Sequence, residues 1–231
     1  SVSAVTFIAV GQFLDNQGVS HGGHMAVALV IMEVPAVIMA VLLAAMTRSL
    51  DEKTKGRSAS SHSNHSDFSI KGILHESFTD GSIVLLMGSL FIGFLVGVDG
   101  YQTIKPFTGD LFKGLLGFFL LEMGITAARR LRDRGRGLDV RLIGFAVLMP
   151  LIGGAAGLAG GWLIGLSTGG VGLMAVLGAS ASYIAVPAAM RLALPSADAG
   201  IYVTLSLAIT FPFNVLAGIP LWLWAARLAT Q

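Results

Sequence analysis

Hydroxyl-bearing side chains interrupt one of the most apolar stretches of the chain. Ser180, Ser182 and Tyr183 lie within "GASASYIAVPAAMRLALPSA", residues 178–197, and Pro187 follows them. A helix that breaks in hydrocarbon leaves backbone N–H and C=O groups unpaired unless protein, water or a ligand satisfies them. A half-helix that starts after Ser182 would turn its N–H groups toward an anion, and the carbonyls before it suit a cation. The alternative is a helix kinked at Pro187, with serine hydroxyls bonded back to preceding carbonyls.

The same order of features occurs at the start of the chain. Ser1 and Ser3 form a first S-x-S motif, matching the one at Ser180 and Ser182, and it is followed by a short apolar stretch, a loop and a span that contains Pro35. Ser3 and Pro35 are 32 residues apart, and Ser182 and Pro212 are 30 apart. If the repeating unit has five spans, the two copies enter the membrane in opposite senses, because five is odd. The correspondence therefore predicts an inverted repeat and favours the ion-site interpretation.

Further polar groups lie in the spans that follow the two motifs. Glu33 is near Pro35, and an ionisable residue inside a span is a functional hypothesis by default. Thr210 and Asn214 are four residues apart and share one helix face. Together with Thr6, these three residues are the candidate cation ligands. Hydrogen bonds between spans explain such residues equally well.

Other kinds of chemistry have little support in the sequence. His21 and His24 lack a third ligand, so they do not predict a metal site. The glycine-rich run at 153–162 matches small-residue helix packing and lacks the context of a nucleotide-binding loop. The chain contains neither a nucleophile–base pair nor clustered catalytic carboxylates, and we therefore do not expect an enzyme.

The elements that position these residues are predicted to be membrane-spanning helices. Of the 231 residues, 54% are hydrophobic and 12% are charged, and the mean hydropathy is +0.78. A soluble domain has about 25% charged residues, so the sequence predicts an all-α polytopic membrane protein. Residues 1–14 are too short to cross alone, and we expect the N-terminal part of the first repeat to be missing. The predicted spans are 24–46, 81–98, 106–127, 140–166, 171–190 and 200–226.

These spans divide the chain into three segments and predict its orientation in the membrane. Residues 1–46 are the expected tail of the first repeat, 47–80 a flexible linker, and 81–231 a second five-span repeat. Twelve basic residues fall on the side of the linker, whereas Lys105 and Arg227 fall on the other. The positive-inside rule makes the linker and the 128–139 loop cytoplasmic and the C-terminus external.

Several stretches of the chain carry a family resemblance. They are "SVSAVTFIAV" at 1–10, "FFLLEMGITAARRL" at 118–131, "ASASYIAVPAAMRLALPSA" at 179–197 and "LAITFPFNVLAGIPL" at 207–221. Together with the arrangement of spans, they resemble the sodium-dependent bicarbonate transporter family of the cyanobacterial type. The run Ser-Tyr-Ile-Ala-Val-Pro-Ala-Ala-Met-Arg is the most specific part of this resemblance.

The resemblance implies an architecture and a site. Members of the family have ten spans in two inverted five-span repeats, a core and a gate domain, and two crossing broken helices that bind bicarbonate and sodium. They are trimers regulated from the cytoplasm by a PII-like protein. By resemblance, the substrate-binding residues are Ser1, Ser3 and Ala4 at the first crossover and Ser180, Ser182 and Tyr183 at the second.

The predicted function is Na⁺-coupled symport of bicarbonate into the cell across the plasma (inner) membrane. Na⁺ is the expected coupling ion, with no organic cofactor, and the expected partners are lipid, a homotrimer and a PII-like regulator rather than nucleic acid. One alternative is transport of another small anion, and a second is a receptor or scaffold that does not transport. Cation/proton exchange would require a buried Asp or Lys at the crossover, and none occurs within 178–190.

Overall fold

The computed structural model describes residues 2–33, 35–36, 39, 81–134, 138–183, 190 and 197–231. The predicted linker, Ser1 and Pro187 lie outside the described residues. All regular structure within the described ranges is helical, as expected, and residues 25–33 are helical as well. The other elements are α1 (Ala4–Asn16), α4 (Gly81–Lys105), η1 (Pro106–Leu111), α5 (Phe112–Arg134), α6 (Val140–Leu163), α7 (Thr168–Ala179), α9 (Ala199–Thr204), η3 (Leu205–Thr210), α10 (Phe211–Phe213), η4 (Asn214–Gly218) and α11 (Ile219–Ala229).

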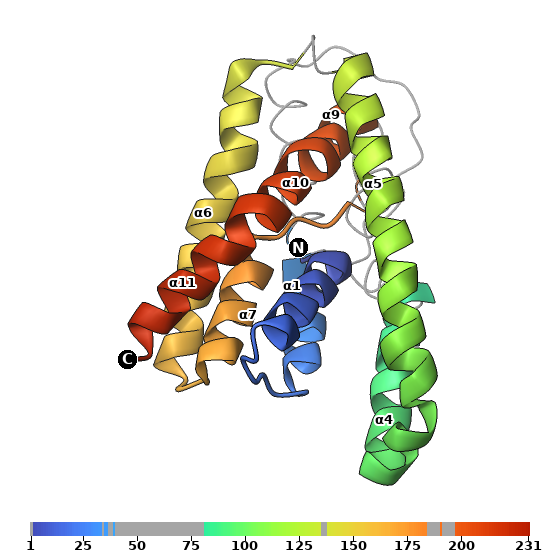
Figure 1. Cartoon of the computed structure of the whole chain (residues 1–231). Helices are drawn as coiled ribbons and strands as arrows, with labels where there is room; N and C mark the ends of the chain where they lie inside the picture. Colours follow the sequence, from blue (N-terminus) through green and yellow to red (C-terminus); the bar gives the residue numbers. More distant parts are fainter. Residues whose placement is uncertain are drawn as a thin grey trace, which may run out of the picture.

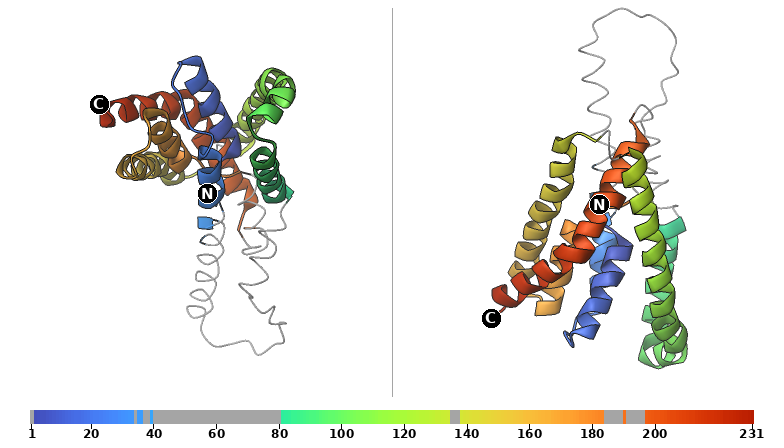
Figure 2. Two further views of the ribbon diagram at one scale, coloured as in Figure 1. Left: turned by 90° about the horizontal axis from the view of Figure 1, so that it is seen from below. Right: turned by 45° about the horizontal axis from the view of Figure 1, so that its top comes forward.

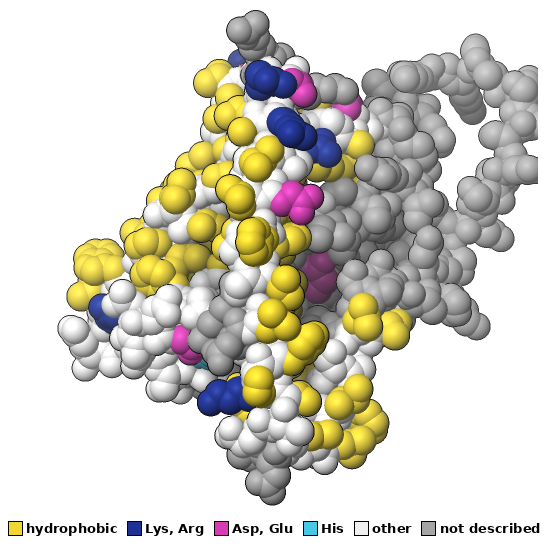
Figure 3. All heavy atoms as spheres, turned by 45° about the vertical axis from the view of Figure 1, so that its right-hand side comes forward, with side chains coloured by type: hydrophobic (Ala, Val, Ile, Leu, Met, Phe, Trp, Pro, Cys, Tyr) yellow, Lys and Arg dark blue, Asp and Glu magenta, His cyan; other side chains and the backbone are white. Residues whose placement is uncertain are grey.

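Three helical stretches of the described chain are long and apolar enough to cross a membrane, judged by length and composition. They are Gly100–Asp133, Val140–Leu163 and Ala199–Ala229, the last being the rod from α9 to α11 in Figure 1. Large apolar side chains on these helices face outward, and Phe118 is 75% exposed. Figure 3 shows such side chains spread along the length of the molecule. Surfaces of this kind are stable in hydrocarbon rather than in water.

The chain turns at Gly97 and not in the loop predicted between 98 and 106. Gly97 has φ 65° and ψ −161° inside α4, a conformation that glycine adopts far more readily than other residues. The residues that follow it are helical through η1 and into α5. Figures 1 and 2 show the resulting hairpin, in which the part of α4 before Gly97 runs beside the helix that continues through η1. The predicted loop was therefore wrong, although the two arms of the hairpin were expected.

A glycine contact holds α6 against α7. A Cβ added to Gly153 would collide with the carbonyl oxygen of Gly178, and one added to Gly157 would collide with that of Met174. Glycine at these positions lets the two backbones touch, which confirms the small-residue packing predicted for 153–162. On the far side of α7, a buried apolar cluster joins it to α1 and α11. Helix α7 is thus fixed along its whole length.

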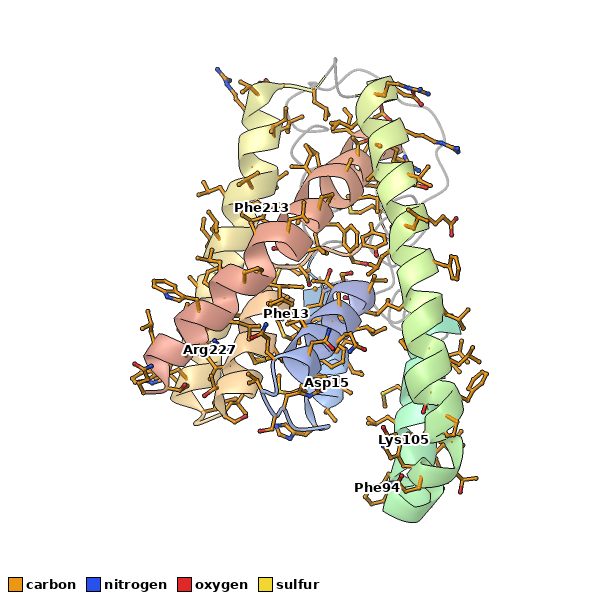
Figure 4. The ribbon with its side chains drawn as sticks, in the orientation of Figure 1. Phe13, Asp15, Phe94, Lys105, Phe213 and Arg227 are labelled. Carbon is orange, nitrogen blue, oxygen red and sulfur yellow. The ribbon has the colours of Figure 1, made fainter. Side chains whose placement is uncertain are left out.

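The two ends of the molecule differ in charge. The end of α5 and the start of α6 lie together at one end, near the start of α9 (Figure 1), and Arg129, Arg132 and Arg141 belong to these segments. Figure 4 shows Lys105 and Arg227 toward the opposite end, where α1 meets its following loop. The described basic residues therefore separate in the manner expected from the predicted spans.

Candidate functional site

Helix α1 begins inside the protein at a serine cap. The Ser3 hydroxyl oxygen accepts a hydrogen bond from the Thr6 backbone N–H at 3.2 Å, and both residues are buried. Serine is a favoured residue at this position because its oxygen satisfies one of the first N–H groups of a helix. A capped helix therefore starts at Ser3 of the first S-x-S motif.

Helix α7 ends at the other S-x-S motif. After Ala179 the backbone becomes extended at Ser180, with φ −79° and ψ 161°. The Ser180 hydroxyl donates to the Leu177 carbonyl at 2.8 Å and accepts from the Ser3 N–H at 2.9 Å. Two segments 177 residues apart in the chain are thus joined at the break. The positive end of α1 and the negative end of α7 meet there.

Two backbone donors remain open at the start of α1. Of the first N–H groups, those of Ser3 and Thr6 are used by the serine hydroxyls. Those of Ala4 and Val5 have no acceptor among the described residues, and Ala4 is exposed. Unpaired N–H groups at a helix N-terminus form a ready site for an anion.

Tyr183 lies beside the break and packs among apolar residues. Its side chain is 9% exposed, and its ring packs edge-to-face with Phe211 at a centroid distance of 5.5 Å. The hydroxyl is close to the Ser3 side chain, but no hydrogen bond of normal geometry reaches it from the described residues. Ser182 is buried as well. The half-helix predicted to follow Ser182 lies largely outside the described residues.

Glu33 reaches the first break from the next helix. One oxygen of its carboxylate accepts a hydrogen bond from the Val2 N–H at 2.8 Å, and Val2 immediately precedes Ser3. The side chain is half-buried. Its carboxyl oxygens are hard ligands of the kind that cations take, and they lie beside the start of α1.

Asn214 reaches the second break from the last helix. Its side-chain N–H₂ donates to the Ala179 carbonyl at 2.7 Å, at the end of α7. The side chain is 1% exposed, and its oxygen has no hydrogen-bond partner among the described residues. A Cβ on Gly218 would lie 2.7 Å from that oxygen, so glycine is what leaves room for it. A hard oxygen acceptor is therefore buried next to the carbonyl end of α7.

Thr210 makes a bond between helices. Its hydroxyl donates to the Ala146 carbonyl of α6 at 2.7 Å. Pro150 lies in α6 four residues after Ala146 and has no N–H to donate to that carbonyl. The threonine supplies the missing donor. This is the kind of interhelical hydrogen bond that was the alternative to a cation ligand.

Of the predicted site residues, the structure brings Ser3, Ala4, Ser180, Ser182 and Tyr183 to the break, with Thr6 buried in the first turn of α1. Glu33 accepts from the Val2 N–H beside the start of α1, and Asn214 donates to the Ala179 carbonyl at the end of α7. Ser1 lies outside the described residues. Sequence reasoning missed Phe211, which packs on Tyr183. The only available signal was its place beside Pro212 in the run "ITFPF".

Apolar helices around polar helix ends are the arrangement in which secondary transporters hold their ions. The family model of the Na⁺-dependent bicarbonate transporter superfamily matches residues 1–227, and the chain belongs to that superfamily. This confirms the resemblance found in the sequence, with sodium and bicarbonate as the transport chemistry of the family. A comparison with curated proteins found no match.

Proposed function

We propose that the protein is a symporter that uses Na⁺ entry to bring bicarbonate into the cell. The observation that carries this proposal is the hydrogen bond from the Ser3 N–H to the Ser180 hydroxyl. It brings a helix start and a helix end to one point, where backbone donors suited to an anion lie beside carbonyls suited to a cation.

The proposed anion site uses the start of α1 and the second break. The open N–H groups of Ala4 and Val5 would bind the oxygens of bicarbonate. Around them, the hydroxyls of Ser3, Ser182 and Tyr183 would complete the site. Ser1 and Ser180 are the two further proposed contacts, and Ser180 also joins the two half-helices.

The proposed cation site lies on the carbonyl side of the same break. The buried oxygen of Asn214 and the carboxylate of Glu33 support it, because hard oxygens are the ligands that Na⁺ takes. Thr6 and Thr210 are the other proposed ligands. If the two ions stabilise the same arrangement of α1 and α7, each raises the affinity for the other, which couples their transport.

The proposal also covers the surroundings of the site. The separation of basic residues between the two ends supports a cytoplasmic position for 47–80 and 128–139 and an external C-terminus in the plasma membrane. Inverted five-span repeats, core and gate domains, a homotrimer and a PII-like regulator are proposed on family membership.

Uptake of radiolabelled bicarbonate into proteoliposomes tests the proposal, using the protein at its natural length with and without a Na⁺ gradient. Ser182→Leu is the test variant, because it removes a buried hydroxyl at the break. Ser206→Ala is the control, because the Ser206 hydroxyl bonds back to carbonyls of its own helix. Na⁺-dependent uptake that is lost only in Ser182→Leu is the expected result.

Two other outcomes would decide between the alternatives. Uptake that depends on Na⁺ but is specific for another small anion would replace bicarbonate and leave the site in place. If no anion is taken up in either Na⁺ condition, the receptor or scaffold function is favoured and the symport proposal is wrong.

A further inference from the structure

The phenol of Tyr183 is a buried polar group beside the start of α1. Its oxygen makes no hydrogen bond of normal geometry with the described residues. Ser3 is close to it, and the Ser3 hydroxyl, whose oxygen accepts from the Thr6 N–H, keeps its own hydrogen to donate to the phenol oxygen. A buried O–H without a partner is unfavourable. With the Ser3 hydroxyl as donor, the O–H hydrogen of Tyr183 still has no acceptor among the described residues, and an anion bound at the break would supply one.

The ring of Tyr183 packs against residues that lie outside the break. It meets Phe211 at a centroid distance of 5.5 Å and an interplanar angle of 66°, an edge-to-face arrangement that aromatic pairs favour. Both rings belong to one apolar cluster between α5, the last helix and the start of α1. Its other members are Val5, Leu120, Met123, Ala127, Leu207, Ala208 and Val215.

The last helix has an irregular backbone where Phe211 lies. The short α10 contains Phe211 and Pro212 and is flanked by the wide π-helical turns η3 and η4. Proline removes one backbone donor from a helix, and wide turns of this kind shift the direction in which side chains point. The irregular segment places Phe211 in the same cluster as Tyr183 and Ala127 of α5.

We infer that Phe211 is a positioning residue whose ring directs the Tyr183 hydroxyl at the anion bound beside Ala4 and Val5. The identity of that anion rests on the proposed function, whereas the role of Phe211 rests on the aromatic contact. Because Met123 and Ala127 of α5 close the other side of the cluster, the contact between α5 and the last helix helps to set the direction of the phenol.

Uptake kinetics at saturating Na⁺ test the inference. Phe211→Leu removes the aromatic edge but keeps an apolar side chain. Phe213→Leu makes the same change in the same short helix, outside the cluster (Figure 4). We expect Phe211→Leu to raise the KM for bicarbonate about tenfold, or about 1.4 kcal/mol, with an unchanged maximal rate. Phe213→Leu should behave like the unaltered protein, and equal KM values in the two variants would overturn the inference.

A double-mutant cycle shows whether Phe211 acts through the phenol. In a Tyr183→Phe background the hydroxyl is absent, so Phe211→Leu should cause no further rise in KM. If the rises caused by the two changes multiply, Phe211 acts independently of Tyr183 and the inference is wrong.

Fluorine NMR of protein labelled with 3-fluorotyrosine answers the same question without transport. The chain has 3 tyrosines, and Tyr183→Phe identifies the resonance of interest. Phe211→Leu should shift that resonance, because an adjacent ring is removed, and Phe213→Leu should leave it in place. A protein that takes up no bicarbonate would contradict the proposed function alone. An unmoved Tyr183 resonance in Phe211→Leu would contradict the role of Phe211.

Discussion

The contact between α6 and α7 makes Gly153→Ala an informative perturbation. A Cβ on Gly153 would overlap the carbonyl oxygen of Gly178, and a Cβ on Gly178 would overlap that of Gly153. Non-bonded carbon atoms pack at separations of about 3.5–4.0 Å. A Cβ that overlaps a backbone oxygen would therefore force the two helices to separate. Both colliding groups are backbone, and no change of rotamer relieves them.

The expected change in the free energy of unfolding of Gly153→Ala combines two opposing effects. Overpacking a tight contact costs about 1–3 kcal/mol, and a collision with backbone belongs at the upper end of that range. Alanine in place of glycine stabilises a helix interior by about 1 kcal/mol. We therefore expect Gly153→Ala to lower the free energy of unfolding by about 2 kcal/mol. Gly160→Ala is the matched control, because it lies in the same helix with no atom within 4 Å of its added Cβ.

Reversible unfolding in mixed micelles, driven by a denaturing detergent, measures both variants. Gly160→Ala should be more stable than the unaltered protein by about 1 kcal/mol, so the two variants should differ by about 3 kcal/mol. Gly153→Ala should also slow bicarbonate uptake, because α7 carries Ser180 at its end. Equal free energies of unfolding for the two variants would show that α6 and α7 do not touch at these glycines.

Three other changes can be measured in the same two assays. Thr210→Val should lower the free energy of unfolding by about 1–2 kcal/mol, because the Ala146 carbonyl loses its donor, whereas Thr210→Ser should retain it. Gly97→Ala should cost about 1–2 kcal/mol through its positive φ alone, since no atom lies within 4 Å, and an equal loss in Gly93→Ala would contradict this. Ser180→Ala should raise the KM for bicarbonate about tenfold, because the hydroxyl that joins the start of α1 to the end of α7 at the anion site is lost, and an unchanged KM would separate Ser180 from that site.

The polar break was predictable because its signals are local and occur twice. Ser1–Ser3 and Ser180–Ser182 precede a proline at nearly the same separation, so each motif supports the interpretation of the other. The pairing of Ser3 with Ser180 is what such a repeat leads one to expect. The cap at Ser3 and the chain break at Ser180 are likewise readable from residue type.

Other features depend on neighbours that the sequence does not place. The predicted spans 81–98 and 106–127 left a loop between them, but the turn is made by Gly97. Glycine occurs 30 times in the chain, so its presence did not single out one position.

The hydrogen-bond partner of a hydroxyl is likewise not predictable from the sequence. Thr210 bonds a carbonyl 64 residues away, which Pro150 had left without its helical donor. Nothing in the sequence indicates that a proline on one span and a threonine on another share a carbonyl. Phe211 was missed for the same reason, because an aromatic residue in an apolar span has many equivalent partners until the helices are packed.

The opposed directions of α1 and α7 bear on how the membrane potential acts. The two half-helices have 13 and 12 residues, and they reach the break from the same end of the molecule, one by its start and the other by its end (Figure 1). Their dipoles therefore point in opposite directions and nearly cancel along their common axis. The pair therefore has little net dipole on which an electric field across the membrane could act. In the proposed symport, the current carried in each cycle would accordingly report the charge of the bound ions rather than movement of these backbone charges.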